Sequence, residues 1–146
     1  EAFKQGVGSR INVSLGGTID KKRFTPLEVE VYVRALTDGV YSNGGLSACA
    51  GRTATYHLHQ HTVVVSEKPA STTCSAFFLA IGEDPLDYDF VIAKSPNGFR
   101  IFYEQFASEI VYADVPGSTS ADVTTLPYKK APRPMYPLDK EIEPGF

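Results

Sequence analysis

The sequence has no tryptophan, one methionine and only two cysteines in 146 residues, and the scarcity of cysteine excludes one class of protein at once. Cys49 and Cys74 do not form a Cys-x-x-Cys pair, and they are too few for the disulfide framework of a small secreted domain. We interpret them as two free thiols of a cytoplasmic protein, and the spacing alone leaves a bridge between them open.

Long apolar runs and basic clusters are also missing. No run approaches the roughly 20 residues of a membrane-spanning helix, and no signal peptide is evident. The formal net charge is −3, and the densest basic run, Lys21-Lys22-Arg23, is typical of a solvated turn. The glycine-rich stretch YSNGG (41–45) lacks the spacing and the lysine of a nucleotide-binding loop. The sequence therefore favours neither a membrane protein nor a protein that binds nucleic acids or nucleotides.

Alternating apolar residues predict β-strands in the first half of the chain. Residues 10–15 (RINVSL) and 27–36 (LEVEVYVRAL) place apolar side chains at every second position. Two further β-rich stretches, residues 52–58 and 62–68, flank a short polar segment. Between these pairs, residues 37–51 are rich in Gly, Ser and Asn and indicate a loop.

The second half predicts alternating helices and strands. Apolar spacing indicates a helix over about 74–81 and an aromatic helix over 99–106, while 88–95 (YDFVIAKS) and 109–117 are typical of strands. Such an order implies a right-handed crossover and a parallel strand pair. We therefore predict one α+β domain over residues 1–146, with antiparallel strands and a hairpin, then a βαβ-like half completing a mixed sheet. An extended proline-rich tail follows at 127–146.

Three stretches together resemble a known family. They are PLEVEVYVRALTDGVYSN (26–43), GRTATYHLHQHTVVVSEK (51–68) and DPLDYDFVIAKSPNGFRIFYEQFASEIVYADVPG (84–117) with its sequel LPYKKAPRPMYPLD (126–139). The most specific motifs are Lys-Ser-x-x-x-Phe-Arg at 94–100, Asp-x-Pro-Gly at 114–117 and the tail. From about residue 6 to 139 the chain is similar to the C-terminal domain of the bacterial microcystinase C-like metallopeptidases.

The resemblance implies a hydrolase whose zinc ligands lie in a larger N-terminal domain. This chain would then hold no catalytic residue and no metal ligand of its own, and by itself would be inactive. Its expected partners are that N-terminal catalytic domain and a peptide or amide substrate, and a homo-oligomer is left open. The alternative is a non-catalytic binding or assembly module of a divergent relative. Two departures favour divergence: the loop after Ser42-Asn43 is shorter than in the family, and Gly98 stands where some relatives have His.

Four residues are candidates for contacts in the substrate cleft of the larger protein: Asn43, Lys94, Ser95 and Arg100. Lys94, Ser95 and Arg100 follow a predicted strand and precede a predicted helix, where open α/β sheets bind ligands and where helix N–H groups favour anions. A plain turn followed by a helix start is the alternative for this segment. Asn43 opens the glycine-rich loop, which is either cleft-facing or a simple connection.

All three histidines of the chain, His57, His59 and His61, fall in YHLHQH. On one continuous strand they would share a face and could supply three nitrogens to zinc. That strand would be about seventeen residues long, far beyond the usual length. A turn at His59-Gln60, where the family often has Gly-Gly, would separate the rings instead. We therefore predict a hairpin tip, with adventitious metal binding as the alternative.

Overall fold

A computed structural model describes residues 1–95, 97–113, 115, 122–140 and 142. By its contacts the chain divides into two compact units, Glu1–Ile110 and Val111–Phe146. The first unit holds every strand of the described residues, and the candidate cleft residues belong to it. Whether residues 1–146 act as one domain remains a prediction.

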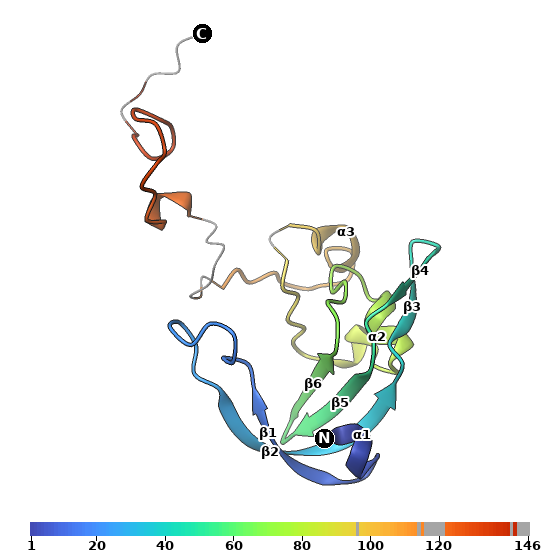
Figure 1. The fold of residues 1–146 in the computed structure, drawn as a ribbon. Coiled ribbons are helices and arrows are strands. Elements are labelled where there is room, and N and C mark those ends of the chain that lie inside the picture. Colours follow the sequence, from blue (N-terminus) through green and yellow to red (C-terminus); the bar gives the residue numbers. More distant parts are fainter. Residues whose placement is uncertain (96, 114, 116–121, 141, 143–146) are drawn as a thin grey trace. The chain divides into compact units, whose positions relative to one another are not determined.

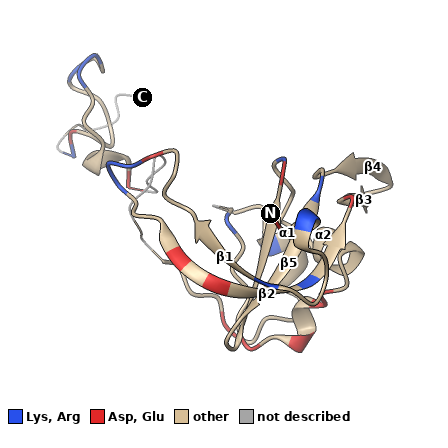
Figure 2. Ribbon diagram, turned by 60° about the horizontal axis from the view of Figure 1, so that its bottom comes forward, with Lys and Arg blue, Asp and Glu red and all other residues tan. Residues whose placement is uncertain are grey.

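The first unit is built on a four-stranded antiparallel sheet in the order β1-β2-β5-β6 (Figure 1). Its strands are β1 Arg10–Leu15, β2 Leu27–Thr37, β5 Thr53–Leu58 and β6 His61–Ser66. The predicted alternation places these strands correctly, because Val31 and Val33 are fully buried while Glu28 and Glu30 on the same strand face solvent. Figure 2 shows the positions of the acidic residues along β2 as red bands on the ribbon. The predicted antiparallel half is confirmed.

Both faces of the sheet carry a core, at different places. On one face Ile11, Val31, Val33 and Tyr56 pack together, covered by Ala2 of the short helix α1, Ala2–Gln5. On the other face a second cluster joins helix α2, Ala76–Ala80, to the hairpin β3–β4, and consists of Tyr41, Ala50, Phe77 and Ile81. The central strand β5 is consequently buried on both sides from Thr53 to Tyr56.

The stretch predicted as a loop, residues 37–51, contains a second sheet. Strand β3, Val40–Asn43, pairs antiparallel with β4, Leu46–Cys49. The connection consists of Gly44 and Gly45, both with positive φ (60° and 83°), which is the backbone that a tight two-residue hairpin of twisted strands requires. Asn-Gly-Gly is a hairpin signal, and the prediction of an unstructured loop was wrong.

The helices are shorter than predicted. Helix α2 ends at Ala80, and Gly82 follows with φ 82°, the left-handed conformation expected just beyond a helix. The 3₁₀ turn η1 covers Pro85–Asp87 and is capped by Asp84, whose side chain accepts a hydrogen bond from the Leu86 amide at 3.0 Å. Helix α3 extends only over Arg100–Tyr103.

The βαβ-like half differs from its prediction, although the α+β class is confirmed. Residues 88–95 form no strand, and among described residues neither do those of 109–117; positions 114, 116 and 117 lie outside the description. Every strand pair within the described part of the chain is antiparallel, so the predicted parallel pair is absent there. The apolar run of 88–95 finds no sheet in this chain to enter, and Phe90 and Ile92 are 87% and 90% exposed.

The second unit contains no strand and one 3₁₀ turn, η2 Val123–Thr125, in its described residues. In the proline-rich segment, Arg133 pairs with Asp139 at 2.5 Å, and the Asp139 carboxylate also accepts the Met135 amide at 2.8 Å. These contacts close a local turn, so 133–139 is irregular but not fully extended. None of the helices among the described residues has the length and apolar character of a membrane span.

Candidate functional site

Two of the candidate cleft residues, Asn43 and Ser95, lie close to one connecting segment, residues 71–74, which enters helix α2. The thiol of Cys74 donates a hydrogen bond to Oδ1 of Asn43, with a distance of 3.5 Å between Sγ and Oδ1. Thr73 lies against Gly98, and Gly98 also lies beside Ser95, so this second stretch of chain reaches the same segment. Three parts of the chain that are distant in sequence therefore come together here, and we name their described residues the loop cluster: 41–45, 71–74, 94–95 and 97–100.

Hydrogen bonds within the loop cluster fix residues 71–74. The hydroxyl of Tyr41 accepts the Ser71 amide at 3.0 Å, and the Ser71 and Thr73 hydroxyls lie 2.8 Å apart. Tyr41 is itself held in the second core, where its ring meets that of Phe77 at 5.3 Å. The cluster is thus anchored to the fold through the start of α2 and through β3.

Gly98 explains how closely the loops approach. A Cβ at this position would lie 3.1 Å from Cγ2 of Thr73 and 3.2 Å from Oγ of Ser95, tighter than most real contacts. Ser95 is accordingly beside residue 98, half-buried in the cluster. A histidine at 98 would require Thr73 and Ser95 to move, so this chain is packed for glycine.

The two cationic candidates, Arg100 and Lys94, differ in how readily each could bind a ligand. Arg100 donates to Glu104 at 2.7 Å, one helical turn on, and its guanidinium lies 5.9 Å from the centre of the Phe99 ring. Lys94 is exposed. A ligand that used Arg100 would have to compete with Glu104, so Lys94 is the cation better suited to an incoming carboxylate or carbonyl group.

Helix α3 does not offer the anion site that its sequence suggested. It has four residues, begins after Phe99 without a side-chain cap, and is too short to present a helical dipole of any size. What α3 contributes instead is Tyr103, which is 6% exposed. The Tyr103 hydroxyl is buried with no hydrogen-bond partner among the described residues. Burial, aided by the nearby Cys74 thiol, raises the pKa of Tyr103 to about 12.

The histidines occupy a hairpin tip, as predicted. Strand β5 ends at Leu58 and β6 begins at His61, and these two residues pair directly. His57 pairs with Thr62, so His57 and His61 point to opposite faces of the sheet, while His59 lies in the turn with φ 53°. No three His, Cys, Asp or Glu residues in the described ranges are grouped as metal ligands. These residues do not fit a zinc site.

His57 instead belongs to a polar network. Arg34 occupies the extra position of a β-bulge between β2 and β5, where the register shifts between Val33 and Ala35. Its Nη1 lies 3.0 Å from Nε2 of His57 and 3.0 Å from Oε2 of Glu83. Because a guanidinium only donates, Nε2 of His57 must accept, which puts the proton of the neutral ring on Nδ1.

Glu83 is the buried end of this network. Its side chain is 6% exposed, and its Oε2 also accepts the Tyr88 hydroxyl at 2.5 Å. The Tyr88 hydroxyl in turn lies 3.2 Å from Oγ1 of Thr62 on β6. These bonds attach the segment that follows α2 to the sheet. Sequence analysis missed Glu83, since only burial distinguishes Glu83 from the acidic residues that follow it.

An open hollow of about 430 Å³ lies beside His57. It is lined by Arg10, Tyr32, His57 and His59, three of which form one row across the sheet through the pairs Arg10–Tyr32 and Tyr32–His57. Arg10 pairs with Glu30 at 3.3 Å there, and both side chains are well exposed. The hollow therefore belongs to the polar face of the sheet and includes none of the four candidate residues.

Comparisons with known proteins agree with the resemblance found in the sequence. The family model described as MlrC C-terminus matches residues 1–130. Microcystinase C of a Sphingomonas species is 25% identical over 138 residues, which cover 94% of this chain and 26% of that protein. The crystal structure of a "Putative metallopeptidase" from Mesorhizobium sp. BNC1 is 26% identical with a TM-score of 0.80, and the match covers 94% of this chain and 28% of that one.

The chain thus spans about a quarter of the length of both relatives, and nearly all of its own length is matched. The family model matches most of the sequence. The Mesorhizobium structure has the same fold over the matched region. The chain belongs to the MlrC C-terminus family.

Proposed function

We propose that this domain is the C-terminal accessory domain of a zinc-dependent metallopeptidase or amidohydrolase similar to microcystinase C. In this proposal it supports and shapes a substrate cleft whose metal ligands lie in another, N-terminal domain. The family, and the names of the two relatives, support hydrolase chemistry in a longer polypeptide. The partner in the proposal is that catalytic domain, and the substrate is a peptide or an amide.

The observation that carries the proposal is the loop cluster. Asn43 is bonded to Cys74, and Ser95 lies beside Gly98, which contacts Thr73. Exposed Lys94 precedes Ser95 in the chain. Asn43 keeps its amide N–H donors for other groups while Oδ1 accepts from Cys74. Amide and ammonium donors of this kind bind carbonyl and carboxylate oxygens, the groups that a peptide substrate presents.

The chemistry would come from outside this chain. A bound zinc supplies an activated water for amide hydrolysis. The described residues hold no group of three metal ligands, and Nε2 of His57 is already occupied by Arg34. We therefore assign this domain the binding and positioning of substrate and no step at the metal.

The test is metal analysis and kinetics of the longer polypeptide that contains this chain. We expect bound zinc in the longer polypeptide and none above background in this chain alone. Lys94→Met should lower kcat/KM at least several-fold, Arg100→Met should lower it less, and Lys22→Met, in the β1–β2 loop, should leave it unchanged. An active longer polypeptide without metal would overturn the zinc assignment, and unchanged kcat/KM in Lys94→Met would remove the cleft role of this loop.

The alternative function is a non-catalytic binding or assembly module, and it would fit the packing at Gly98, which leaves no room for a larger side chain unless Thr73 and Ser95 move. A longer polypeptide that holds no zinc and hydrolyses no peptide or amide would favour it.

A further inference from the structure

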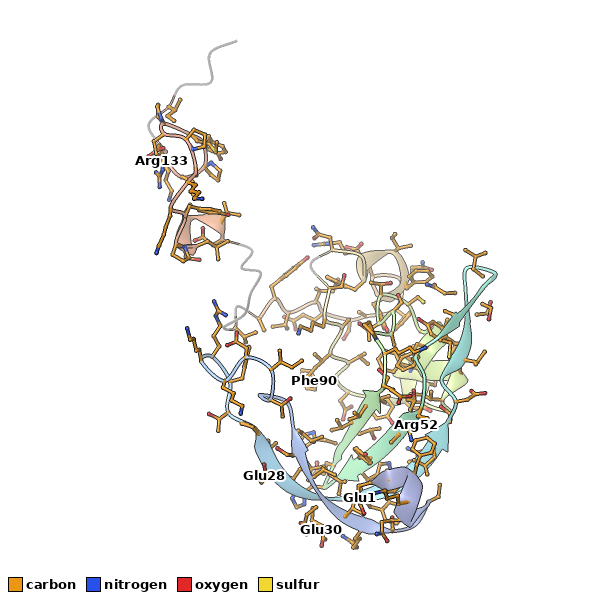
Figure 3. The ribbon with its side chains drawn as sticks, viewed as in Figure 1. Glu1, Glu28, Glu30, Arg52, Phe90 and Arg133 are labelled. Carbon is orange, nitrogen blue, oxygen red and sulfur yellow. The ribbon has the colours of Figure 1, made fainter. Side chains whose placement is uncertain are left out.

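The segment between η1 and α3 has the sequence of a buried strand and the surroundings of a surface loop. Phe90 and Ile92 are 87% and 90% exposed, and Val91 between them is 38% exposed. This period of two is that of an extended chain with one side turned fully to solvent. Figure 3 labels Phe90 on this segment, where its ring projects away from the ribbon. Large apolar side chains gathered in this way mark an interaction site.

The backbone N–H groups of the segment also lack partners among the described residues. Within the described part of the chain, no backbone N–H from Asp89 to Lys94 donates a hydrogen bond to another residue. Six consecutive free donors, next to exposed apolar side chains, are the features of a strand that lacks a neighbour. A surface loop with no binding role would more commonly carry polar side chains and turns.

The N-terminal end of the segment is fixed to the fold. The Tyr88 hydroxyl contacts both Glu83 and Thr62. At the other end the Ser95 amide donates to the Ala93 carbonyl at 2.9 Å, which is a local bond within the end of the segment itself. The position of the segment beside β6 is therefore set at Tyr88.

The geometry points to strand addition: we infer that residues 89–94 join, as a strand, the edge of a β-sheet formed by the remainder of the longer polypeptide. That occupant is favoured because both relatives are more than three times as long as the matched region. A sheet edge satisfies the N–H groups that point toward it, which are those of every second residue, and apolar pockets on one face of that sheet receive Phe90 and Ile92. This also accounts for a buried-strand sequence that lies exposed in this chain.

The inference rests on one part of the proposed function, the link to a longer polypeptide, and not on zinc. Hydrogen–deuterium exchange tests it directly. We expect the amides of residues 89–94 to exchange rapidly in this chain alone, and every second one of them to exchange at least a hundredfold more slowly in the longer polypeptide. Equally rapid exchange in both would overturn the inference. Protection that grows with concentration in this chain alone would assign the segment to a second copy, which would also overturn it.

A pair of variants separates the interface from folding. Phe90→Ser with Ile92→Ser removes two side chains that are almost fully exposed here, so the melting temperature of this chain alone should stay unchanged. In the longer polypeptide the same double variant should abolish most of the protection at 89–94. The matched control is Ile19→Ser, at a site 99% exposed in the β1–β2 loop, which should leave the protection intact. Full protection in the double variant would contradict the inference.

The two proposals can fail separately. Bound zinc and hydrolysis without protection at 89–94 would retain the proposed function and reject strand addition. Protection without zinc or hydrolysis would retain strand addition and reject the proposed function.

Discussion

Arg34 and Glu83 lie 49 positions apart in the sequence and are joined at 3.0 Å, with the guanidinium carried by a β-bulge and the carboxylate almost fully buried. Arg34 is 42% exposed, so the pair is half-buried, and one nitrogen of Arg34 serves both Glu83 and His57. This ion pair attaches the segment after α2 to the sheet. We therefore expect the stability of the fold to depend on the negative charge of Glu83.

Glu83→Gln should destabilise the domain by about 2 kcal/mol, because Arg34 loses its charged partner in a site with little water; full burial would cost more. The free energy of unfolding, measured by urea denaturation, checks this. The control is Glu30→Gln, whose partner Arg10 is 71% exposed, and its effect should stay within about 0.5 kcal/mol. Equal effects of the two changes would contradict the role of burial.

Two buried tyrosines, Tyr41 of the loop cluster and Tyr103 of α3, should respond to loss of their hydroxyls with opposite changes in stability. Tyr103→Phe should stabilise this chain by about 1 kcal/mol, because the hydroxyl it removes has no partner. Tyr41→Phe should destabilise it by a similar amount, since the Ser71 amide would lose its acceptor. Urea denaturation of the two variants measures both. A loss of stability in Tyr103→Phe would mean that its hydroxyl is satisfied.

Tyr103 also predicts a change of stability at alkaline pH. Its pKa is raised from 10.0 to about 12, chiefly by burial, so the folded state holds the phenol proton more tightly than the unfolded state does. This contribution is constant below pH 10 and is lost as the pH rises from 10 to 12. Between about pH 9 and pH 11, the unfolding free energy of Tyr103→Phe should therefore fall less than that of the wild type. Parallel curves would contradict the assignment.

The hairpin tip predicts a stabilising substitution. His59 has φ 53°, a conformation that costs a non-glycine residue about 1 kcal/mol. His59→Gly should raise the melting temperature slightly, and the β-branched His59→Val should lower it. Thermal unfolding followed by circular dichroism makes the comparison. A stabilised valine variant would show that the turn does not hold this backbone in solution.

Sequence analysis succeeded where one side of a strand is buried in this chain. The alternation of β1 and β2 follows from their packing over the first core, and the turn at His59-Gln60 follows from the limit on strand length. It failed for β3 and β4 because each strand has only four residues, too few for alternation to be recognised, although Gly44-Gly45 marked the turn.

The βαβ-like half illustrates a different limit. Residues 88–95 have the composition of a buried strand, but composition does not say which polypeptide buries it. Within the candidate site, Asn43 and Ser95 do approach one segment, whereas Arg100 is engaged by Glu104. The contributions of Thr73 and Tyr103 could not be predicted, because they depend on contacts between loops that no local pattern encodes.

The two thiols differ in accessibility, and that difference gives the protein a built-in chemical reporter. Both cysteines are free; Cys49 is exposed on the β3–β4 hairpin, while Cys74 is buried under Asn43 at the centre of the loop cluster. An alkylating reagent therefore modifies Cys49 at once and reaches Cys74 only when the loops separate. The rate at which Cys74 is labelled measures how often the candidate cleft wall opens.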